Sequence, residues 1–434
     1  MASRNSTCFL ARRRALAFIA SSLVALAAPI PARAADEIHW TIVGQTAVAF
    51  DWRGRETTIE FGTSPGVYTR SVTATAPSPM PNSSAGPFQE ARITGLVENT
   101  LYYYRIGTGT ESTFRTPPPR GGSGFWIAAE ADIGTSTSYA TVLPNQQGIA
   151  EDSPNLSGDD RPRFVLVAGD LTYGDDHGRA HVDQHFNDVM VWSRFAAYMP
   201  AWGNHEWGSA EDDLQNYEGR FDLPNTQTSP GAPSSGGPGD DWYWFDYGNA
   251  RFISFPEPYS GAWSDWKTKA GAIMAAAQAD AAITFIVTYG HRPAYSSGSD
   301  HGGEPSIATP MKDLHALYSK YVMNIQGHTH HYERTDPAQS DGIVHIITGG
   351  GGSSLGGLAS SAPSWSVYRM EHVHHLKLYF AADRILGYCM CGPAGAGNAD
   401  TCSEGSVVDA WVVMTPGAAD QMAPAPPGNL RLRP

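Results

Sequence analysis

The sequence has little positive charge with which to bind an anionic polymer. Its 29 lysines and arginines are outnumbered by 43 aspartates and glutamates, which gives a formal net charge of −14 at pH 7. Proteins that bind nucleic acids carry clusters of basic residues, so this balance argues against a nucleic-acid partner. The chain also contains no phosphate-cradling Walker sequence, and nucleotide-driven work is therefore not implied.

Long hydrophobic runs are equally scarce. The apolar stretch at residues 15–28 is too short to cross a bilayer, and no later segment is long enough. Arg12, Arg13 and Arg14 precede this stretch and a small-x-small sequence at 32–34 follows it, a pattern typical of a cleaved signal peptide. We therefore expect residues 1–34 to direct export to the periplasm or the extracellular space, rather than to form a membrane anchor. The adjacent arginines permit a twin-arginine signal as well as a general secretory one.

Cysteines are few. Of the four in the chain, Cys8 lies in the expected signal peptide, which leaves Cys389, Cys391 and Cys402. An exported protein can form a disulfide, and a bridge from Cys402 to either of the other two would close the Gly-rich segment between them. One thiol would then remain over. A Cys-x-Cys pair without a second such pair does not predict a structural zinc site.

The composition is otherwise that of a globular protein with more than one domain. A length of 434 residues suggests two or three domains, and 41% of the residues are hydrophobic and 17% charged. Residues 36–118 consist of short alternating stretches separated by Gly, Pro, Ser and Asn, which predicts an all-β domain ending in a Pro/Gly-rich boundary at 116–124. We expect a long loop near a site entrance at 209–241, and a Pro/Ala-rich tail at 415–434.

From residue 125 onward the sequence pattern is that of an α/β domain. Five apolar runs each end in polar residues: 125–134, 163–176, 198–208, 283–293 and 321–331. Helical patterns at 181–198 and 264–282 lie between some of these runs. Continuous apolar strands that end in polar loops are typical of a sheet covered on both faces. Ligands bind beyond the carboxyl ends of such strands, so the five ends define one candidate site.

The polar residues at those ends are of types that bind metal ions. They are Asp132, Asp170, Tyr173, Asn204, His205, Glu206, His291, His328 and His330. Any one of these residues could have an ordinary role, such as capping a helix. Such roles do not explain why residues of these types recur at five successive strand ends. Carboxylates and a phenolate suit a trivalent ion, whereas imidazoles and an amide suit a divalent one. Two such ions can clamp both the attacking and the leaving oxygen of a phosphoryl displacement.

The segments "ADIG", "GDLTY", "GNHE", "YGH" and "GHTH" resemble, in this order, the five blocks of the purple acid phosphatases, within the calcineurin-like metallophosphoesterase superfamily. The resemblance covers residues 119–414 and implies an α/β fold, a four-layer sandwich of two mixed β-sheets flanked by helices. Residues 35–118 resemble a small all-β fibronectin type III sandwich, in which Leu96, Thr100 and Tyr102 would close the last corner.

Two departures from the family pattern are visible. The first block usually begins Gly-Asp, whereas Ala131 precedes Asp132 here; this change keeps the ligand. Thr288 stands where the fourth block often has Val, at a strand position that we do not expect to matter.

The resemblance implies a ferric ion, Fe(3+), beside a divalent ion of zinc, iron or manganese. Asp132, Asp170, Tyr173 and His330 would hold the ferric ion, with Asp170 bridging, and Asn204, His291 and His328 would complete the divalent site. His205 would bind phosphate or protonate the leaving group, and His301 and Glu304 would face the substrate. Asp300 falls where plant members of the family have a second histidine, so the handling of the leaving group is expected to differ. His331 is not expected to be a ligand.

The implied function is an exported acid phosphatase that hydrolyses small phosphate monoesters by attack of metal-bound hydroxide. Two alternatives stay open: a phosphodiesterase or phospholipase C-like hydrolase on the same core, and a surface binding protein with a vestigial site. The Gly-x-Ser-x-Gly sequence at 352–356 matches a nucleophile elbow, but no helix pattern follows it, and a Gly-rich loop beside the site is expected. His177, His181 and His185 fit a helix beside the site better than a second metal site.

Overall fold

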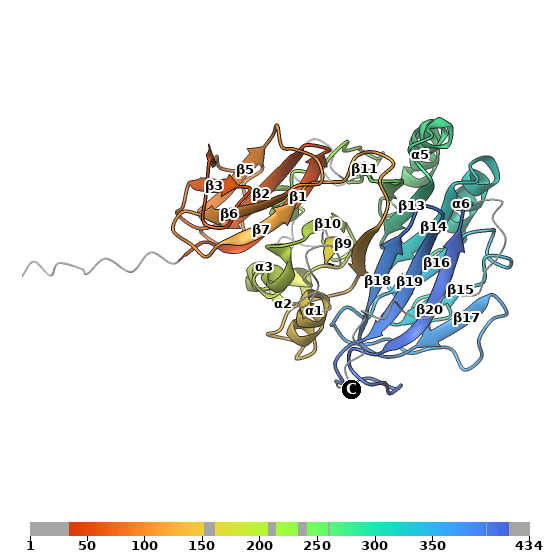
Figure 1. Ribbon diagram of the computed structural model, residues 1–434. Helices are drawn as coiled ribbons and strands as arrows, with labels where there is room; N and C mark the ends of the chain where they lie inside the picture. Colours follow the sequence, from red (N-terminus) through yellow and green to blue (C-terminus); the bar gives the residue numbers. More distant parts are fainter. Residues whose placement is uncertain are drawn as a thin grey trace, which may run out of the picture. The chain divides into compact units, whose positions relative to one another are not determined.

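The computed structural model describes residues 34–151, 161–206, 214–232, 241–258, 261–395 and 397–415. Within them, four β-sheets form: two in an N-terminal sandwich and two in a larger α/β domain (Figure 1). The expected signal peptide and nearly all of the expected C-terminal tail lie outside the described residues. None of the described helices is both long and apolar enough to span a membrane.

The N-terminal sandwich pairs a three-stranded antiparallel sheet, β1-β2-β5, with a four-stranded one, β4-β3-β6-β7. The strands are β1 (Asp36–Gly44), β2 (Ala47–Arg53), β3 (Thr58–Gly62), β4 (Arg70–Thr73), β5 (Phe88–Ile93), β6 (Leu101–Ile106) and β7 (Ser112–Arg115). Residues along β6 alternate between buried and partly exposed, because only one face of this sheet packs on the core. At the expected corner, Leu96 is buried and the Val97 N–H donates to the Tyr102 hydroxyl at 2.9 Å. The Thr100 hydroxyl donates to the Glu98 carbonyl.

The first sheet of the α/β domain has the order β10-β9-β8-β18-β19-β20. Its strands are β8 (Phe125–Glu130), β9 (Pro162–Ala168), β10 (Ala197–Ala201), β18 (His374–Phe380), β19 (Arg384–Cys391) and β20 (Val407–Met414). The first three run parallel, whereas β18, β19 and β20 pair antiparallel. The sheet is therefore mixed.

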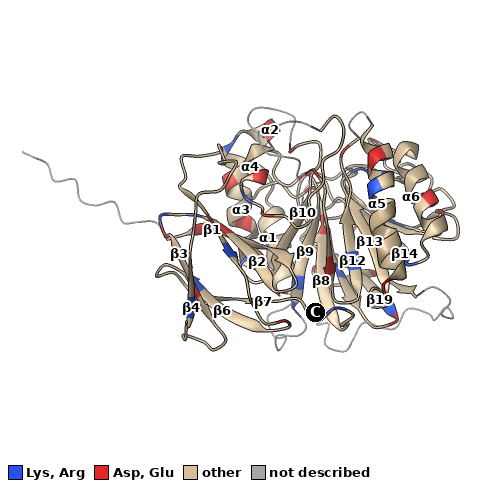
Figure 2. Cartoon of the chain, turned by 90° about the horizontal axis from the view of Figure 1, so that it is seen from above, with Lys and Arg blue, Asp and Glu red and all other residues tan. Residues whose placement is uncertain are grey.

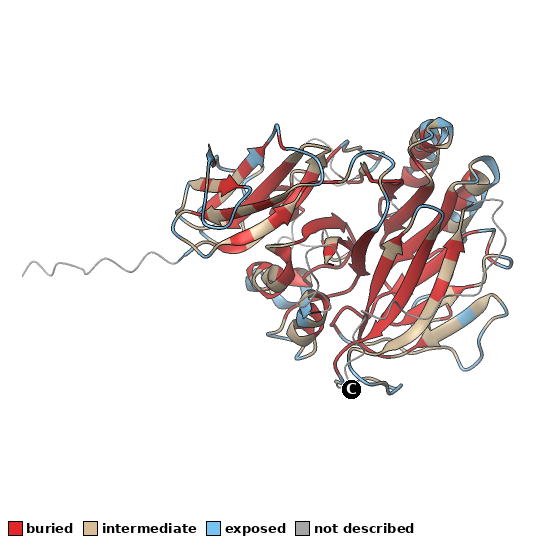
Figure 3. Ribbon diagram, in the orientation of Figure 1, coloured by how far each residue is buried: buried red, intermediate tan, exposed pale blue. Residues whose placement is uncertain are grey.

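The second sheet has the order β11-β12-β13-β14-β16-β15-β17. Its strands are β11 (Trp244–Tyr247), β12 (Ala250–Ser254), β13 (Phe285–Gly290), β14 (Tyr321–Gln326), β15 (Tyr332–Thr335), β16 (Val344–Thr348) and β17 (Ser366–Met370). The four central strands β12, β13, β14 and β16 are parallel. All residues of β13 and β14 are buried, which explains their continuous apolar sequence (Figure 3).

Aromatic residues join the two sheets of the α/β domain, and helices cover them. Phe252 of the second sheet lies 5.2 Å from Phe164 and 5.5 Å from Phe380 of the first, between ring centroids. The helices are α1 (Val142–Glu151), α2 (Gly174–His177), α3 (Ala180–Ser193), α4 (Gln215–Glu218), α5 (Ala262–Ala279) and α6 (Pro305–Leu317). The charged residues of α5 are Asp265, Lys267 and Lys269 near its start, and Lys269 pairs with Asp265 at 2.9 Å, while the buried face of α5 packs with α6 on the second sheet (Figure 2). This is the four-layer fold that the resemblance implies.

Strand β1 of the sandwich packs against the α/β domain, next to α3 and β10. The imidazole of His39 lies 4.7 Å from the Phe186 ring and 5.0 Å from the Phe221 ring, and its Nε2 lies 2.7 Å from the Arg220 carbonyl. Next to it, the guanidinium of Arg220 pairs with Glu37 at 3.0 Å. The two domains thus share a buried apolar and ionic interface.

The five apolar runs predicted as strands all form strands: β8, β9, β10, β13 and β14. The helix predicted at 181–198 is shorter than expected, because Ala197–Ala201 pairs with β9 as a strand instead. The loop expected at 209–241 lies partly outside the described residues. Its described part contains the short helix α4 and the buried Arg220, so it is not a structureless loop.

Candidate metal centre

The seven predicted metal ligands follow the carboxyl ends of five strands. Asp132 follows β8, Asp170 and Tyr173 follow β9, Asn204 follows β10, His291 follows β13, and His328 and His330 follow β14. Within each sheet these strands are parallel, so their ends meet at one edge. The His328 N–H of one sheet donates to Asp132 Oδ2 of the other at 2.9 Å. All seven side chains come together in two groups of converging atoms.

The first group consists of Asp132, Tyr173 and His330. Asp132 Oδ1 lies 3.2 Å from His330 Nε2 and accepts a hydrogen bond from the Tyr173 hydroxyl at 3.2 Å. The Tyr173 hydroxyl lies 2.9 Å from the same His330 nitrogen. On the other side of the ring, His330 Nδ1–H donates to the Ser354 carbonyl at 2.5 Å, which leaves the lone pair on Nε2. Three oxygen and nitrogen atoms therefore converge on one point.

The second group is centred on His291. Its Nε2 lies 3.0 Å from Asp170 Oδ2, 3.2 Å from Asn204 Oδ1 and 3.2 Å from His328 Nδ1. His291 Nδ1–H donates to the Ala168 carbonyl at 3.1 Å, which directs Nε2 at the group. These four residues combine one carboxylate, one amide and two imidazoles, a set that suits a divalent ion of the zinc type.

Four of the seven residues have a left-handed backbone. The φ angles are 59° at Asp132, 50° at Asp170, 55° at Tyr173 and 69° at His328. Residues with a Cβ pay an energetic penalty in this region, and such positions gather at functional sites where the surrounding structure holds them. At Asp170 the surrounding chain packs closely: Gly203 approaches so near that a Cβ there would lie 2.2 Å from Asp170 Oδ1.

The pKa shifts show how strongly these groups interact. Burial alone would raise the pKa of Asp170, but the adjacent His291 imidazole lowers it well below its usual value. Burial lowers the pKa of His291, but the Asp170 carboxylate outweighs this effect and raises it to about 10. Burial raises the pKa of Tyr173 well above its usual value, and the Asp132 and Asp170 carboxylates add to this rise. A metal cation would take the place of the proton that His291 holds against Asp170, and a trivalent charge would displace the proton of Tyr173.

His205 lies beside the two groups. Its Nδ1–H donates to the Asp175 carboxylate at 2.8 Å, and its Nε2 lies 3.9 Å from Asp170 Oδ2. The ring packs 4.5 Å from that of Tyr173. Burial lowers the pKa of His205, but the hydrogen bond to Asp175 and the charge of Asp170 raise it to about 9. Both carboxylates therefore favour the protonated form of His205.

A wall of side chains stands next to His328. The His301 ring stacks on the His328 ring, with centroids 4.2 Å apart. Arg292, which the sequence analysis did not single out, places Nη1 3.0 Å from His328 Nε2 and donates from Nε to the buried Glu257 at 2.9 Å. Glu304 lies 3.6 Å from the same guanidinium. His301 and Glu304 thus both lie beside His328 and Arg292.

Two comparisons with protein families agree with this arrangement. Residues 126–332 match the calcineurin-like phosphoesterase family, and residues 35–118 match the purple acid phosphatase N-terminal domain. The chain belongs to the purple acid phosphatase family. Its ordered motifs, its two domains and its mixed α/β fold are those of that family.

Relatives of the chain carry different names. A nucleotide pyrophosphatase/phosphodiesterase of Hordeum vulgare is 26% identical over 305 residues, which cover 61% of this chain and 79% of that protein. Acid phosphatase type 7 of Homo sapiens is 24% identical over 399 residues, 80% of this chain and 85% of that protein. Probable inactive purple acid phosphatase 27 of Arabidopsis thaliana is 25% identical over 343 residues, 68% of this chain, and the match spans 54% of that longer protein.

Solved structures share the fold. The purple acid phosphatase PPD1 of yellow lupin superposes with a TM-score of 0.66 at 19% identity, and the match covers 88% of this chain and 74% of that one. The structure of PhoD superposes with a TM-score of 0.58 at 11% identity, over 87% and 90% of the two chains. At these identities the likeness concerns the fold alone.

A dinuclear metal centre is a property of the purple acid phosphatase family, and the donor set of this chain fits it. The first group offers two oxygens and one imidazole, and the second offers nitrogens with a carboxylate and an amide oxygen. Asp132 and Asp170 are buried carboxylates. A buried carboxylate is costly unless a cation balances its charge, and a metal ion would do so here.

Sequence reasoning missed several supporting residues. Glu206 was noted at a strand end without a role, yet its buried carboxylate accepts backbone N–H groups from Asp170, Leu171 and Gly203. Asp175 orients His205. The sequence signal was present in both cases, because each lies within two residues of a predicted site residue.

The remaining histidines have structural partners. His331 Nε2 lies 3.3 Å from the buried Glu333. His177 and His181 stack on each other with centroids 4.6 Å apart, and His185 bonds to Tyr198 and the Gly134 carbonyl. In the described chain no helix begins after the Gly-x-Ser-x-Gly sequence, and this loop instead supplies the Ser354 carbonyl to His330.

Proposed function

We propose that the chain is an exported acid phosphatase that uses two metal ions to hydrolyse small phosphate monoesters. The observation that carries the proposal is the convergence of seven side chains from five strand ends into two adjacent groups of donor atoms. Asp132, Asp170, Tyr173 and His330 are proposed to hold one ion and Asn204, His291 and His328 the other, with Asp170 between them. A family that hydrolyses phosphoesters supports this assignment.

When bound, the metal pair supplies positive charge for the phosphoryl oxygens and lowers the pKa of a water molecule. The side chains do the rest. His205 is fixed through Nδ1 by Asp175, so its Nε2 is the atom that presents a proton to the departing oxygen. His301 and Arg292 lie beside His328, and we propose that they face the ester group. The proposed roles of His301 and Glu304 are substrate contacts.

The proposed ions are Fe(3+) and a divalent ion of zinc, iron or manganese. The phenolate of Tyr173 is the ligand that favours a ferric ion, because an anionic oxygen binds a trivalent cation more strongly than a divalent one. We expect purified protein to show a visible tyrosinate absorption band that disappears in Tyr173→Phe. A colourless wild-type protein that contains iron and turns over phosphate esters would contradict the role of Tyr173.

Asp170 is the decisive residue for the metal pair. We expect Asp170→Asn to lose both metals and at least 99% of its phosphatase activity, a loss of roughly 3 kcal/mol or more in transition-state stabilisation, because the neutral amide no longer balances two cations. Metal analysis and turnover of an aryl phosphate measure this. Asp313→Asn on α6, whose carboxylate pairs with Lys267, is the matched control and should keep both. Full metal content and turnover in Asp170→Asn would overturn the assignment.

Two alternatives remain in view. A phosphodiesterase on the same core is supported by the name of the Hordeum vulgare relative, and the ratio of activity on aryl phosphate to that on bis-aryl phosphate separates it from a monoesterase. A surface binding protein with a vestigial site is supported by the Arabidopsis relatives named probable inactive. The complete set of seven ligands argues against this second alternative. Metal-loaded protein without hydrolytic activity would favour it.

The proposed export rests on residues 1–34, outside the described part of the chain apart from Ala34. Export removes the signal peptide, so the mature protein should begin near residue 35. Amino-terminal sequencing of protein secreted from its host measures this.

A further inference from the structure

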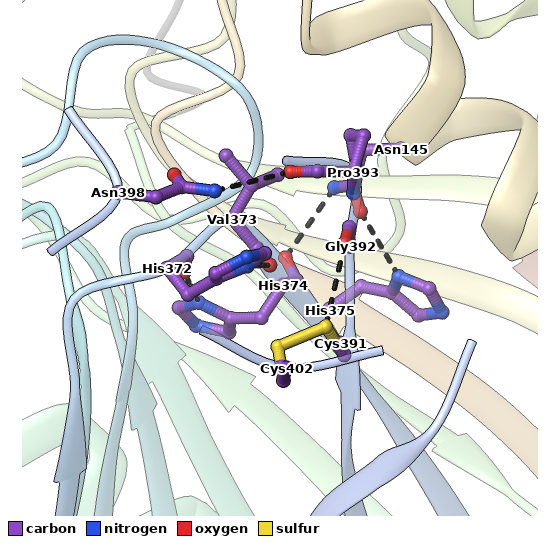
Figure 4. Close-up of a disulfide and its surroundings, with 10 residues drawn as sticks. All are labelled: Asn145, His372, Val373, His374, His375, Cys391, Gly392, Pro393, Asn398 and Cys402. Carbon is purple, nitrogen blue, oxygen red and sulfur yellow. Dashed lines mark hydrogen bonds between the residues drawn. A yellow bond between two sulfur atoms is a disulfide. The ribbon is translucent and has the colours of Figure 1, made fainter. Parts of the chain in front are cut away.

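A second cluster of metal-binding atoms lies at the disulfide (Figure 4). It shares no residue with the candidate metal centre. One ring nitrogen of His372 and the Sγ atoms of Cys391 and Cys402 all lie within 4.8 Å of one another. Two thiolates and one imidazole are the ligands of many zinc sites. In the oxidised protein the two sulfurs are bonded to each other and cannot act as thiolates.

Strand pairing brings the histidine to the cysteines. The register of β18 and β19 places His374 opposite Cys391, so His372, two residues earlier, reaches the same end of the pair. The sequence alone did not predict a zinc site here, because Cys-x-Cys lacked a second pair of ligands. The third ligand comes from the segment just before the neighbouring strand β18, which sequence spacing does not reveal.

The hydrogen bonding of the His372 ring suits a metal ligand. Its Nδ1–H donates to the Val373 carbonyl at 2.9 Å, which leaves the lone pair on Nε2. A histidine that binds a metal through one nitrogen usually donates its other N–H to an oxygen in this way. The side chain is buried, with 2% of its surface exposed, and the His374 Nδ1–H donates to the His372 carbonyl at 2.8 Å. Little reorganisation would be needed for His372 to bind.

The disulfide is accessible from one side. Cys402 is partly exposed while Cys391 is buried, so the Cys402 side is the one that faces solvent. A pocket adjoins the Cys391 side and is lined in part by the carboxylate residues Glu151 and Glu404 and by His375. Acidic walls favour the entry of a cation.

We propose that reduction of the Cys391–Cys402 disulfide creates a binding site for a divalent metal ion of the zinc class, held by both thiolates and His372. A dithiol reductant supplies two electrons and two protons: the S–S bond breaks, two thiols form, and the reductant closes to its own disulfide. The metal ion then displaces the two thiol protons. A water molecule from the pocket completes the tetrahedron. The ion takes over from the disulfide in tying Cys402 to the end of β19.

Cobalt(II) tests the proposal, because a bond from thiolate to Co2+ gives a near-ultraviolet charge-transfer band that oxygen and imidazole ligands do not. Protein with its catalytic metals loaded is reduced with a phosphine, freed of the phosphine without air, and titrated with CoCl2. We expect the band to saturate at one equivalent in reduced protein and to be absent from oxidised protein. His372→Gln, which keeps the disulfide, should weaken Co2+ binding at least tenfold.

Cys389→Ser is the matched control, since Cys389 is a buried free thiol on the same strand outside the cluster; it should leave the band unchanged. Cys402→Ser, and wild-type protein alkylated after reduction, should both lack the band. Reduced wild-type protein without the band, or a band that survives alkylation, overturns the proposal, and unchanged affinity in His372→Gln overturns the imidazole ligand. The band does not depend on phosphatase activity, so the result is independent of the proposed function.

Discussion

The buried carboxylate of Glu206 joins the loops after β9 and β10 by accepting hydrogen bonds from the backbone of both. Its Oε2 accepts the backbone N–H groups of Asp170 at 2.9 Å and Gly203 at 2.7 Å, and its Oε1 accepts that of Leu171 at 2.8 Å. Asp170 has a left-handed backbone, which these bonds help to hold. We therefore expect Glu206→Gln to lower both the stability of the fold and the affinity for metal.

The size of the effect follows from the three bonds. Glutamine has one oxygen, so in its better orientation it keeps the two bonds made by Oε2 and turns its NH2 group toward the Leu171 N–H. The lost acceptor leaves a buried donor unsatisfied, which costs about 1–3 kcal/mol. The two bonds that remain are no longer charge-assisted and lose roughly 1 kcal/mol each. Together the change costs about 3–5 kcal/mol, which corresponds to a melting temperature lower by roughly 4–6 °C for a chain of this size.

Thermal unfolding and metal analysis of the same preparations measure the two effects. A ligand whose supporting hydrogen bonds are lost typically binds metal about 10–100-fold more weakly, so we expect metal to dissociate from Glu206→Gln during dialysis. Glu98→Gln, at an exposed glutamate in the sandwich, is the control for loss of one negative charge. If Glu206→Gln melted within about 1 °C of wild type and kept both metals, the carboxylate would not be what holds these loops.

Two further predictions concern stability. Cys402→Ser should lower the free energy of unfolding by roughly 3 kcal/mol, because the disulfide closes a loop with a sequence separation of 11 and restricts the unfolded chain; an unchanged urea midpoint would refute this. Burial raises the pKa of Glu37 to about 7 despite Arg220, so the protonated form contributes stability that is complete below about pH 4.5 and is lost as the pH rises through about 7. Between pH 4 and pH 8 the stability of wild type relative to Glu37→Gln should therefore fall by about 3 kcal/mol in urea unfolding, and a constant difference would contradict the burial argument.

The convergence of the seven proposed ligands was predictable from sequence because each is a polar residue at the end of an apolar strand. Asp132 and His328 belong to different sheets, yet both follow parallel strands whose carboxyl ends must meet at an edge. Local pattern and strand direction together specify such a site. The same reasoning located the five central strands.

What the sequence did not predict depends on contacts between distant segments or on backbone atoms. Arg292 is held in place by its hydrogen bond to Glu257, 35 positions away in sequence. His330 is oriented by the backbone carbonyl of Ser354, and a backbone atom leaves no mark in the residue type. The choice of Cys391 over Cys389 for the disulfide also depends on where β19 ends, which spacing alone does not give. The strands after β16 were not predicted. Strand β17 pairs at the edge of the second sheet, and β18, β19 and β20 return to the first sheet, so their partners lie far away in sequence.

The packing of His39 on the carbonyl of Arg220 has a consequence for how the protein is synthesised. The two residues are separated by 181 positions, so the N-terminal sandwich leaves the ribosome long before its covering surface exists. During that interval the face of β1 that carries His39 is open to water and to other nascent chains, and an unfinished surface of this kind favours aggregation. Efficient production of this protein should consequently respond to chaperone supply and to growth temperature more strongly than the stability of the finished molecule would suggest.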